Sequence, residues 1–474
     1  MQLTMDKQGT LYEQIARSLK LNILGGRLVA GSRLPSTRAL AIALGVSRKS
    51  VVEAYELLCA EQLVLARGGS GTRVADIGNA DIASKRIRVL PPSRYAARLR
   101  KLPPLNLATA RLDTRPKYNL QYGEPLLNPA LFNSWRRKLA AAALRAGSTY
   151  PDAAGFLPLR RAIADYLARR RGVICDASDI LIVGGTQQAL TLIARVLLNE
   201  QEHVVVEDPH YQLALHGLLA HGARITSVRT DAEGIVVDEM PSRATRLAYV
   251  TPSHQFPSGV IMSLRRRIEL LKWAGRISCW IFEDDYDAEF HSGDRPVASL
   301  RSLDLSERVI YVGSLSKTLF PSLRLGYIVC PKGLRDDLFK AKQLDDLGSP
   351  AIEQAALATF MQSRQFDDHL RASLKEILIR RRTVVDSLER LVPHIEIGPH
   401  QGGMHLVIWF SQLRFSRLDW FLKHARSMAL GLYPIHLYYR IKPSRPGLII
   451  GYAGVSNAQL KTAMDLFTRC VEAI

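Results

Sequence analysis

Short apolar runs that end in glycine, proline or acidic residues recur from about residue 118 onward, separated by helical stretches. The runs are ILIVGG at 180–185, HVVVEDP at 203–209, RLAYVTP at 246–252, CWIFEDDY at 279–286 and VIYVGS at 309–314. Strands that alternate with helices in this way form a largely parallel sheet wrapped by helices. We therefore predict that residues 118–474 form an α/β domain.

The end of that domain has a different pattern. From about residue 365 a long helix is expected through LKEILIRRRTVVDSLERL, and two strand-like stretches, HLVIWF and LIIGYA, follow it. A helix followed by separate strands is typical of an α+β arrangement. Residues 365–474 are therefore expected to form a smaller C-terminal subdomain.

Residues 1–75 predict a separate small domain with three helices. In LYEQIARSLKLNIL the apolar residues recur at the spacing of one helix face, and a pair of glycines stops the pattern. Ser36 caps a second helix, and after the turn at Gly45 a third helix begins behind its own cap, Ser47. The inward stripe of the third helix is expected at Val51, Ala54, Tyr55 and Leu58.

Two helices joined by a tight glycine turn make a helix-turn-helix, and LVLARGGSGTRVA after them predicts two short strands around a glycine hairpin, a wing. Such a unit reads base edges from the start of its second helix and holds phosphates with the cations around it. A small packing module is the alternative for a helix pair alone. The candidate DNA-binding residues are Arg33, Ser36, Thr37, Arg38, Ser47, Arg48, Lys49, Ser50, Gly71 and Arg73.

The charge distribution favours an anionic partner. The formal net charge is +20, and residues 1–75 hold 10 lysines and arginines against 5 acidic residues. Residues 76–117 hold 10 against 3, together with several prolines, and predict a basic linker. A solvated tether is the main interpretation of this segment, and contact with DNA phosphates is the other.

Composition excludes several classes of protein. Hydrophobic residues make up 47% of the chain and charged residues 23%, and no apolar run approaches the roughly 20 residues that cross a bilayer. The first residues lack the regions of a signal peptide, so we expect a cytoplasmic protein without membrane contact. The five cysteines are scattered and form no C-x-x-C pair, so neither disulfides nor a metal site is expected.

Lys317, in GSLSKTLFPSLRLGY, is the candidate reactive residue. A lysine amine that partial burial keeps neutral can form a Schiff base with an aldehyde, whereas a surface lysine after a strand is the plainer alternative. FEDDYD at 282–287 ends a strand, and Asp284 buried there could hold a pyridinium nitrogen protonated. Taken alone, such an acidic cluster is also typical of a solvated loop or a metal site.

A phosphate site is predicted close to Lys317. VGGTQQAL at 183–190 ends a strand and opens a helix, so its first N–H groups and the Thr186 hydroxyl could receive a phosphate. An ordinary strand-to-helix turn is the alternative. Ser314, Ser316 and Arg324 would add two hydroxyls and a guanidinium.

With these motifs the region from about 118 to 474 resembles fold-type I aminotransferases, which use pyridoxal 5′-phosphate. The resemblance implies that Lys317 forms the internal aldimine, that Asp284 partners the pyridine nitrogen and that Tyr286 bonds the phenolic oxygen. Tyr211 in EDPHYQ would stack on the ring. Tyr150 in STYPDAAGFLPLR would reach the phosphate of the neighbouring subunit, which implies a homodimer that exchanges parts between subunits. The implied phosphate cup is Gly185, Thr186, Gln187, Ser314, Ser316 and Arg324.

Two departures from that pattern favour a sensor over an enzyme. Where aminotransferases carry N-P-x-N-P-T-G, this chain has TPSHQFPSG, so Phe256 replaces the cofactor-contacting asparagine and His254 or Gln255 would compensate. The arginine that holds the substrate carboxylate is missing from PGLIIGYAGV, and Arg440 and Arg445 just upstream are the candidates to replace it.

Residues 10–75 closely resemble the winged helix-turn-helix of the GntR family through RLPSTRALA, LGVSRKSVVEAYELL and GSGT, with Gln62 where the family usually has glycine. The order of head, basic linker and aminotransferase-like body resembles the MocR subfamily of bacterial GntR regulators, which are GabR- and PdxR-like. This implies a transcriptional regulator whose body senses pyridoxal phosphate, or a small amine or amino acid that reacts with it, and alters promoter binding. An active aminotransferase that carries a DNA-binding head is the alternative, and a structural DNA-binding protein with an empty body is a third reading.

Overall fold

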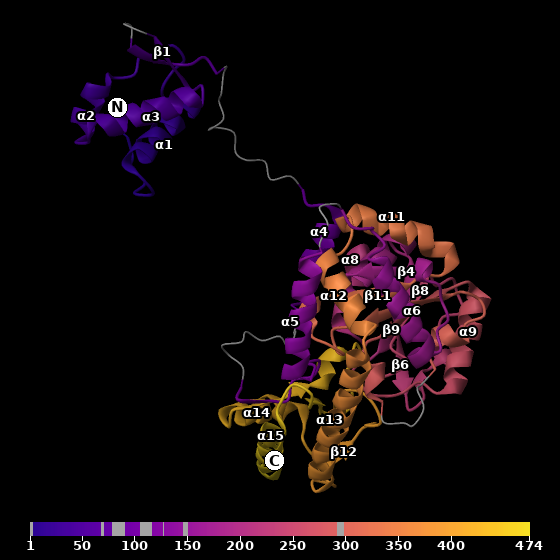
Figure 1. Cartoon of the computed structure of the whole chain (residues 1–474). Helices are drawn as coiled ribbons and strands as arrows, with labels where there is room; N and C mark the ends of the chain where they lie inside the picture. The colour runs from indigo at the N-terminus through magenta and orange to yellow at the C-terminus, as the bar shows by residue number, and fades with distance from the viewer. Residues whose placement is uncertain are drawn as a thin grey trace. The chain divides into compact units, whose positions relative to one another are not determined.

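The structure, a computed structural model, describes residues 3–67, 71–77, 91–104, 116–126, 128–145, 150–291 and 298–474. It divides into two compact units, Met1–Pro92 and Ser93–Ile474, and Figure 1 labels many of their elements. Residues 68–70 of the predicted wing, and 78–90 and 105–115 of the predicted linker, lie outside the described residues. No helix within the described ranges is long and apolar enough to span a bilayer.

The first unit contains the three helices and two strands that the sequence predicts. They are α1 (Leu11–Leu24), α2 (Thr37–Leu44), α3 (Arg48–Ala60), β1 (Val64–Arg67) and β2 (Gly71–Val74). The Ser36 hydroxyl accepts a hydrogen bond from the Ala39 amide, and Ser47 accepts one from the Ser50 amide, so both serines are N-caps. Gly45 ends α2 in the left-handed region at φ +65°, where glycine avoids the strain of a side chain.

A single apolar core holds this unit together. The predicted inward stripe of α3 is buried, at Val51, Ala54, Tyr55 and Leu58, and it packs against α1 and α2. The Tyr55 hydroxyl donates to the Pro35 carbonyl at 2.8 Å, which ties α3 to the residues that precede α2. The two strands pair antiparallel with Arg67 opposite Gly71. The helix-turn-helix with a two-stranded wing is therefore confirmed.

The second unit is built on an eight-stranded sheet in the order β4-β11-β10-β9-β8-β5-β6-β7. The pairs of β11 with β4 and β10, and of β7 with β6, are antiparallel; the other described pairs of the sheet are parallel. The largely parallel sheet expected from the alternating runs is thus confirmed. The strands are β4 (Ile180–Val183), β5 (His203–Asp208), β6 (Arg224–Asp231), β7 (Gly234–Ile235), β8 (Leu247–Val250), β9 (Trp280–Asp285), β10 (Val309–Ser314) and β11 (Gly326–Val329).

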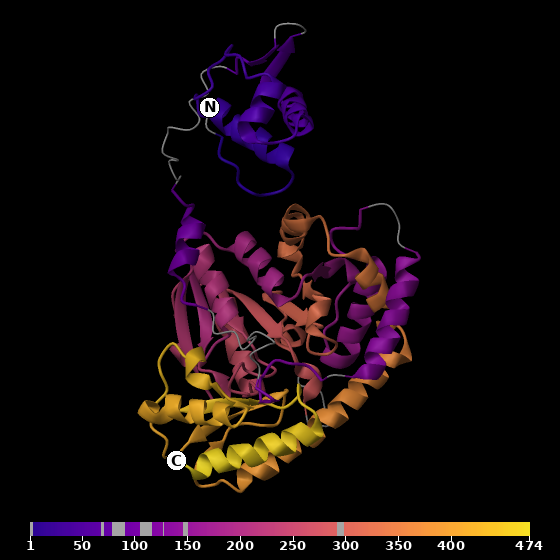
Figure 2. The same cartoon turned by 90° about the vertical axis from the view of Figure 1, so that its left-hand side faces the viewer.

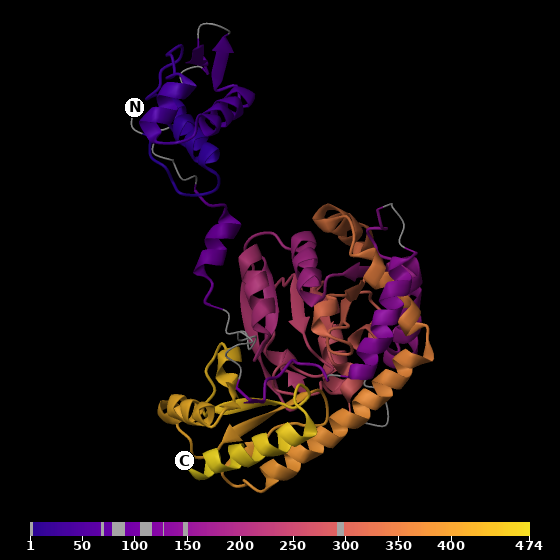
Figure 3. The ribbon, with the colours of Figure 1, turned by 60° about the vertical axis from the view of Figure 1, so that its left-hand side comes forward.

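Helices cover both faces of the sheet (Figure 3). In β4 the side chains alternate, so Leu181 and Val183 join the core under α7 and α8, whereas Ile180 and Ile182 join the core under α6 and α12. Both faces are therefore apolar, as parallel sheets require. The helices of this layer are α5 (Pro129–Ala143), α6 (Leu157–Arg171), α7 (Thr186–Leu197), α8 (Gln212–His221), α9 (Leu264–Ile277), α10 (Leu300–Leu303), α11 (Arg335–Asp346) and α12 (Ala351–Met361).

The C-terminal residues form the predicted α+β subdomain, in which α13 and α15 lie side by side (Figure 2). Its antiparallel sheet has the order β12-β13-β16-β15. A segment from much earlier in the chain also belongs here, because β3 (Tyr118–Asn119) pairs with β14 and Leu120 is buried in the subdomain core. The other elements are α13 (Arg364–Glu389), β12 (Ile395–Ile397), β13 (His405–Phe410), α14 (Phe415–Ser427), β14 (Leu430–Gly431), β15 (Tyr433–Pro434), β16 (Gly447–Gly451) and α15 (Asn457–Glu472).

One part of the predicted linker is a docked helix. Ser93 caps α4 (Arg94–Lys101), and this helix contacts α8 in the second unit. The Arg98 Nε donates to the Ala220 carbonyl at 2.8 Å, and its guanidinium forms an ion pair with Glu200 at 3.0 Å. Tyr95 packs edge-on against His221. Residues 93–101 therefore belong to the second unit, and a solvated tether does not describe them.

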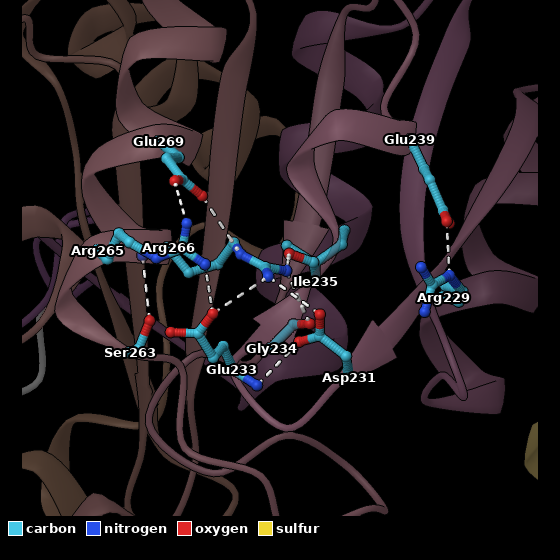
Figure 4. A network of polar contacts seen from close by, with 10 residues as sticks. All are labelled: Arg229, Asp231, Glu233, Gly234, Ile235, Glu239, Ser263, Arg265, Arg266 and Glu269. Atoms are coloured by element: carbon cyan, nitrogen blue, oxygen red, sulfur yellow. Dashed lines mark hydrogen bonds and ion pairs between the residues drawn. The ribbon is translucent and has the colours of Figure 1, made fainter.

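A buried arginine fixes the far edge of the sheet to α9 (Figure 4). The Arg266 guanidinium contacts the backbone carbonyls of Gly234 and Ile235 and forms an ion pair with Asp231 at 3.0 Å. Glu233 and Glu269 lie at 3.6 and 3.4 Å from the same group. Several carboxylates and carbonyls compensate for the burial of one cation, so this network is structural.

Candidate functional site

Lys317 follows the end of β10 in a half-buried turn. Its Nζ donates a hydrogen bond to the Gly123 carbonyl, and a Cβ at Gly123 would lie 3.2 Å from that nitrogen. Burial lowers the pKa of Lys317, while the carboxylates of Asp287, Glu124 and Asp284 oppose the shift. The amine is therefore closer to its neutral, nucleophilic form than a surface lysine is.

Asp284 lies on β9 next to β10 and is buried. Its Oδ2 accepts a hydrogen bond from the Tyr249 hydroxyl at 2.5 Å, and its Oδ1 has no hydrogen-bond partner among the described residues. Burial raises the pKa of Asp284 to about 7, with the Tyr249 hydrogen bond acting in the opposite direction. A buried carboxyl with one unused oxygen fits a cationic N–H group.

The predicted phosphate residues meet where β4 and β10 end and β11 begins. Gly185 caps α7 at φ +92°, and a Cβ there would lie 3.2 Å from the Arg324 guanidinium. Arg324 donates to the Gly184 carbonyl at 2.6 Å, and the Ser316 amide donates to the Ser314 hydroxyl at 3.3 Å. Thr186 and Gln187 begin the helix at this corner. Helix N–H groups, hydroxyls and one exposed guanidinium are thus gathered in one place, as an anion requires.

The aromatic candidates surround Phe256. The rings of Tyr211 and Tyr286 lie edge-on to it with centroids at 5.6 and 6.1 Å. The Tyr286 hydroxyl donates to the His254 carbonyl at 2.9 Å and lies 3.0 Å from the His254 Nδ1. Gln255 instead bonds Glu207 and the Pro209 carbonyl. Of the two residues expected to compensate for Phe256, His254 is therefore the one beside Tyr286.

Sequence spacing missed several members of this site. Asp287 lies 3.0 Å from the His254 Nδ1, and buried His405 packs against the same imidazole at 4.8 Å between ring centroids. His254, Asp287 and His405 each offer one possible metal-ligand atom, and these three atoms all lie within 4.8 Å of one another. Such a group could hold a metal ion, and the spacing of the three residues in the sequence does not predict it. For Tyr249 the sequence contains one indication. This tyrosine lies inside an apolar strand, and a buried tyrosine hydroxyl needs a hydrogen-bond partner.

Three predicted residues lie away from Lys317 in the contacts described. Arg440 donates to the Ile225 carbonyl at 3.1 Å, and Arg445 forms an ion pair with Glu396. Tyr150 is 88% exposed, so in one chain it does not cover the site. A surface pocket of about 500 Å³ between α6 and the start of α13 contains Asp165, Arg169 and Asp367 but none of the predicted site residues.

The first unit gathers its candidate residues around the start of α3. Arg48 reaches the Thr37 hydroxyl at 3.5 Å, and the Ser47 and Ser50 hydroxyls lie 2.8 Å apart. The Ser36 hydroxyl caps α2 as a hydrogen-bond acceptor, so the hydroxyl hydrogen is still available to donate to a phosphate. The five cations Arg33, Arg38, Arg48, Lys49 and Arg73 are all exposed.

The wing is attached to the same surface. The backbones of Arg33 and Arg73 pair in an isolated antiparallel β-bridge, and the Arg73 guanidinium donates a hydrogen bond to the Gly31 carbonyl at 2.8 Å. A Cβ at Gly71 would lie 2.8 Å from the Arg33 guanidinium, and Gly71 has φ +86°, so a side chain would be strained there. The segment before α2 therefore joins the wing to the helix pair.

Comparisons with known proteins cover both units. The family described as "Aminotransferase class I and II" matches residues 115–466, and "Bacterial regulatory proteins, gntR family" matches residues 11–74. The probable rhizopine catabolism regulatory protein MocR of Rhizobium meliloti is 33% identical over 98% of this chain and 94% of its own length. The pyridoxine biosynthesis regulator PdxR of Corynebacterium glutamicum is 30% identical over 83% of this chain and 82% of its own.

Solved structures match the second unit. The kynurenine aminotransferase of Pyrococcus horikoshii, determined in complex with PMP, has a TM-score of 0.69 and 26% identity over 76% of this chain and 92% of its own. An archaeal alanine:glyoxylate aminotransferase has a TM-score of 0.71 at 22% identity, over 81% of this chain and 96% of its own. With a GntR domain before an aminotransferase class I and II domain, and MocR similar along almost the whole length, the chain belongs to the MocR subfamily of helix-turn-helix transcriptional regulators.

Proposed function

We propose that this chain is a bacterial transcriptional regulator that binds pyridoxal 5′-phosphate in its second unit and changes promoter binding by its head in response. Its effector is pyridoxal phosphate itself, linked to vitamin B6 supply, or a small amine or amino acid that reacts with it. One observation supports the proposal most strongly. The half-buried amine of Lys317, whose pKa is lowered, lies near the Asp284 oxygen that has no hydrogen-bond partner, and both residues belong to a chain with a GntR domain.

The residues present fit this cofactor. Pyridoxal phosphate supplies an aldehyde that condenses with amines. Lys317 would bind it covalently, Asp284 would hold a proton on its ring nitrogen, and the Tyr286 hydroxyl would contact its phenolic oxygen. Tyr211 would pack on the ring. The phosphate would be held by Gly185, Thr186, Gln187, Ser314, Ser316 and Arg324, with His254 positioning Tyr286.

The regulator is proposed to act as a homodimer. Tyr150 is almost fully exposed in one chain although it is expected at the phosphate, so the partner subunit would receive it. A dimer would also present two heads to paired DNA sites. For a ligand to alter DNA binding it must bind two arrangements of the dimer unequally, by about 1–3 kcal/mol for a typical coupling.

The test is DNA binding with and without pyridoxal phosphate, measured on the region upstream of the gene itself. We expect the cofactor to change the affinity or footprint of the wild type and to leave Lys317→Ala unchanged, while that variant still binds DNA. Lys340→Ala, at an exposed lysine on α11, is the matched control and should respond like the wild type. A cofactor response that survives in Lys317→Ala would contradict the proposal.

An active aminotransferase is the alternative, and the arginines argue against it. Both candidates for holding a substrate carboxylate are engaged elsewhere, Arg440 with a backbone carbonyl and Arg445 with Glu396. Orientation of an amino acid would suffer without such a clamp. Multiple turnovers with an amino donor and a keto acceptor, abolished in Lys317→Ala, would establish the enzyme instead.

A further inference from the structure

Helix α8 extends from the expected cofactor site to the beginning of the second unit. Its N-cap is Tyr211, the residue expected to pack on the cofactor ring, and its C-cap is Gly222. The helix between them has 10 residues and packs against α7 and β6. Because an α-helix rises 1.5 Å per residue, α8 is about 15 Å long. One regular element therefore connects two distant places on the body.

The start of α8 is fixed to the C-terminal subdomain. The Gln212 Nε2 donates a hydrogen bond to the Leu437 carbonyl at 2.6 Å, and the His210 amide donates to the Tyr438 carbonyl at 2.9 Å. Tyr211 lies between these two hydrogen bonds and is half-buried, so part of its ring is accessible. A ligand that packs on this ring therefore acts directly on the first turn of α8.

The end of α8 holds α4. The Ala220 carbonyl belongs to the last turn of α8, where carbonyls lack a partner within the helix, and the Arg98 Nε donates to it at 2.8 Å. The helix dipole favours a cation at this end. Gly222 has φ +91°, and a Cβ there would lie 3.2 Å from the Arg98 guanidinium, so the two segments are in close contact. The Tyr95 ring lies edge-on to His221 with centroids 5.4 Å apart. Helix α4 therefore docks on the last turn of α8.

Helix α4 is also the place where the chain leaves the body toward the head. The second unit begins at Ser93, the N-cap of α4. Release of α4 from α8 would add its 8 residues to the connection between the two units. A longer connection changes the effective concentration of a second head at a paired DNA site. Docked and released α4 are therefore two arrangements that a ligand can favour unequally.

We propose that α8 transmits cofactor binding to the connection with the head, with Tyr211 as the contact at one end and Arg98 as the positioning residue at the other. This rests on the proposed function, because it requires pyridoxal phosphate beside Lys317. Packing of the cofactor on Tyr211 orders the first turn of α8. Since helix formation is cooperative, the last turn and its contact with Arg98 are stabilised as well. The docked arrangement of α4 therefore binds the cofactor more tightly than the released one.

Amide hydrogen exchange of the full-length protein tests this first without a variant. Saturating pyridoxal phosphate should slow exchange in residues 97–101 at least about fivefold, the lower end of a typical coupling. Residues 270–277 of α9 are the internal reference and should not change. Tyr211→Ala, saturated with the cofactor through Lys317, should lose the slowing. Unchanged exchange in residues 97–101 of the wild type with the cofactor bound overturns the inference.

DNA binding tests the other end of α8. Arg98→Ala and Arg100→Ala are a matched pair, since both remove an arginine from α4 but Arg100 is exposed. We expect Arg100→Ala to respond to pyridoxal phosphate on DNA like the wild type and Arg98→Ala to lose most of that response while it still binds DNA. By linkage, Arg98→Ala should weaken cofactor binding by no more than the coupling that is lost, which the absorption of the bound cofactor measures.

The outcomes separate this inference from the proposed function. A full response to pyridoxal phosphate on DNA in Arg98→Ala overturns the transmission through α8 and leaves the proposed function standing. A wild type that takes up no pyridoxal phosphate, or whose DNA binding does not respond to it, overturns the proposed function before either variant is compared.

Discussion

Asp284 combines three properties that sequence alone does not give. Its position in FEDDYD predicts an acid at the end of a strand, and that prediction follows from local pattern. Its full burial, the Tyr249 hydroxyl on one oxygen and the unused second oxygen come from β8 and β9 lying side by side. The positions of Gly123, Asp287 and His405 around Lys317 also cannot be predicted from the sequence. Their contacts join segments that are far apart in the chain, and no periodic pattern of residues indicates such contacts.

Replacement of Asp284 by Asn should weaken cofactor binding strongly. A neutral amide cannot balance a protonated ring nitrogen, and a charge-assisted hydrogen bond is worth about 1.5–3 kcal/mol, so a loss of at least about tenfold in affinity is expected. Equilibrium dialysis of pyridoxal phosphate measures it. Tyr249→Phe removes only the supporting hydrogen bond and should lose less. Equal losses in both variants would exclude a direct role for the Asp284 charge.

Glu289 predicts a pH dependence of stability. Burial raises its pKa from 4.5 to about 7, although the Tyr166 hydroxyl donates to it. The folded state therefore holds this proton more tightly than the unfolded state, so the stabilisation is complete below about pH 4.5 and is lost as the pH rises through 7. Gln keeps an acceptor for Tyr166 and never ionises.

Glu289→Gln should thus match the wild type near pH 5 and exceed it near pH 8. The expected gain is on the order of 1 kcal/mol, because one pKa unit corresponds to about 1.4 kcal/mol and part of the shift is screened. Thermal unfolding of both proteins across this pH range measures it. A difference in melting temperature that stays constant with pH would show that the Glu289 proton is not linked to folding.

At the scale of elements, the head could be predicted almost to the residue, whereas the linker could not. Each helix of the head carries its own start and stop signals, such as Ser36, Ser47 and Gly45, and these act through neighbouring backbone groups. Helix α4 has local signals too, the Ser93 cap and the basic residues of its last turn, but its docking depends on Glu200 and Ala220, more than 100 positions away. Basic composition and nearby prolines therefore predict a tether, which the docked helix corrects.

Arg98→Ala should loosen α4 from the second unit. The side chain supplies a hydrogen bond to Ala220 and an ion pair with Glu200, of which the first is the stronger contribution. We expect amide hydrogen exchange in residues 97–101 to rise about tenfold, which corresponds to roughly 1.4 kcal/mol of local stability. Arg100→Ala, at an exposed arginine on the same helix, should exchange like the wild type. Unchanged exchange in Arg98→Ala would mean that other contacts hold α4.

The start of α3 predicts two separable effects on DNA binding. Lys49 is exposed and only weakly paired with Glu53 at 3.9 Å, so its cation is available for a phosphate. Lys49→Ala should weaken binding to all sequences alike and reduce the slope of log affinity against log salt by about 1. Lys20→Ala, whose lysine is paired with Glu61 at 2.8 Å, is the control and should keep the slope. A variant with the wild-type salt slope would place Lys49 away from the DNA.

For the whole molecule, fold and family follow from the sequence because two independent sets of motifs occur on one chain in a fixed order. The oligomeric assembly is harder to predict from the sequence. The exposed ring of Tyr150 is unexplained within a single chain, since a large aromatic side chain that is 88% exposed gains little there. Exchange of this residue between subunits would explain it, and would make each cofactor site depend on two chains.

Mixed dimers of Lys317→Ala and Tyr150→Phe distinguish exchange from a site within one chain. If Tyr150 crosses, one site of the mixed dimer has neither group, and the other has Lys317 from one chain and Tyr150 from its partner, as in the wild type. If it does not cross, every site lacks one of the two. Exchange therefore predicts that differently tagged, co-purified mixed dimers bind one pyridoxal phosphate per dimer with wild-type affinity. Homodimers of either variant should show no such site, because Lys317→Ala loses the covalent bond and Tyr150→Phe loses a hydroxyl at the phosphate, about tenfold in affinity. If the mixed dimer bound only as weakly as the Tyr150→Phe homodimer, Tyr150 would serve its own subunit or none.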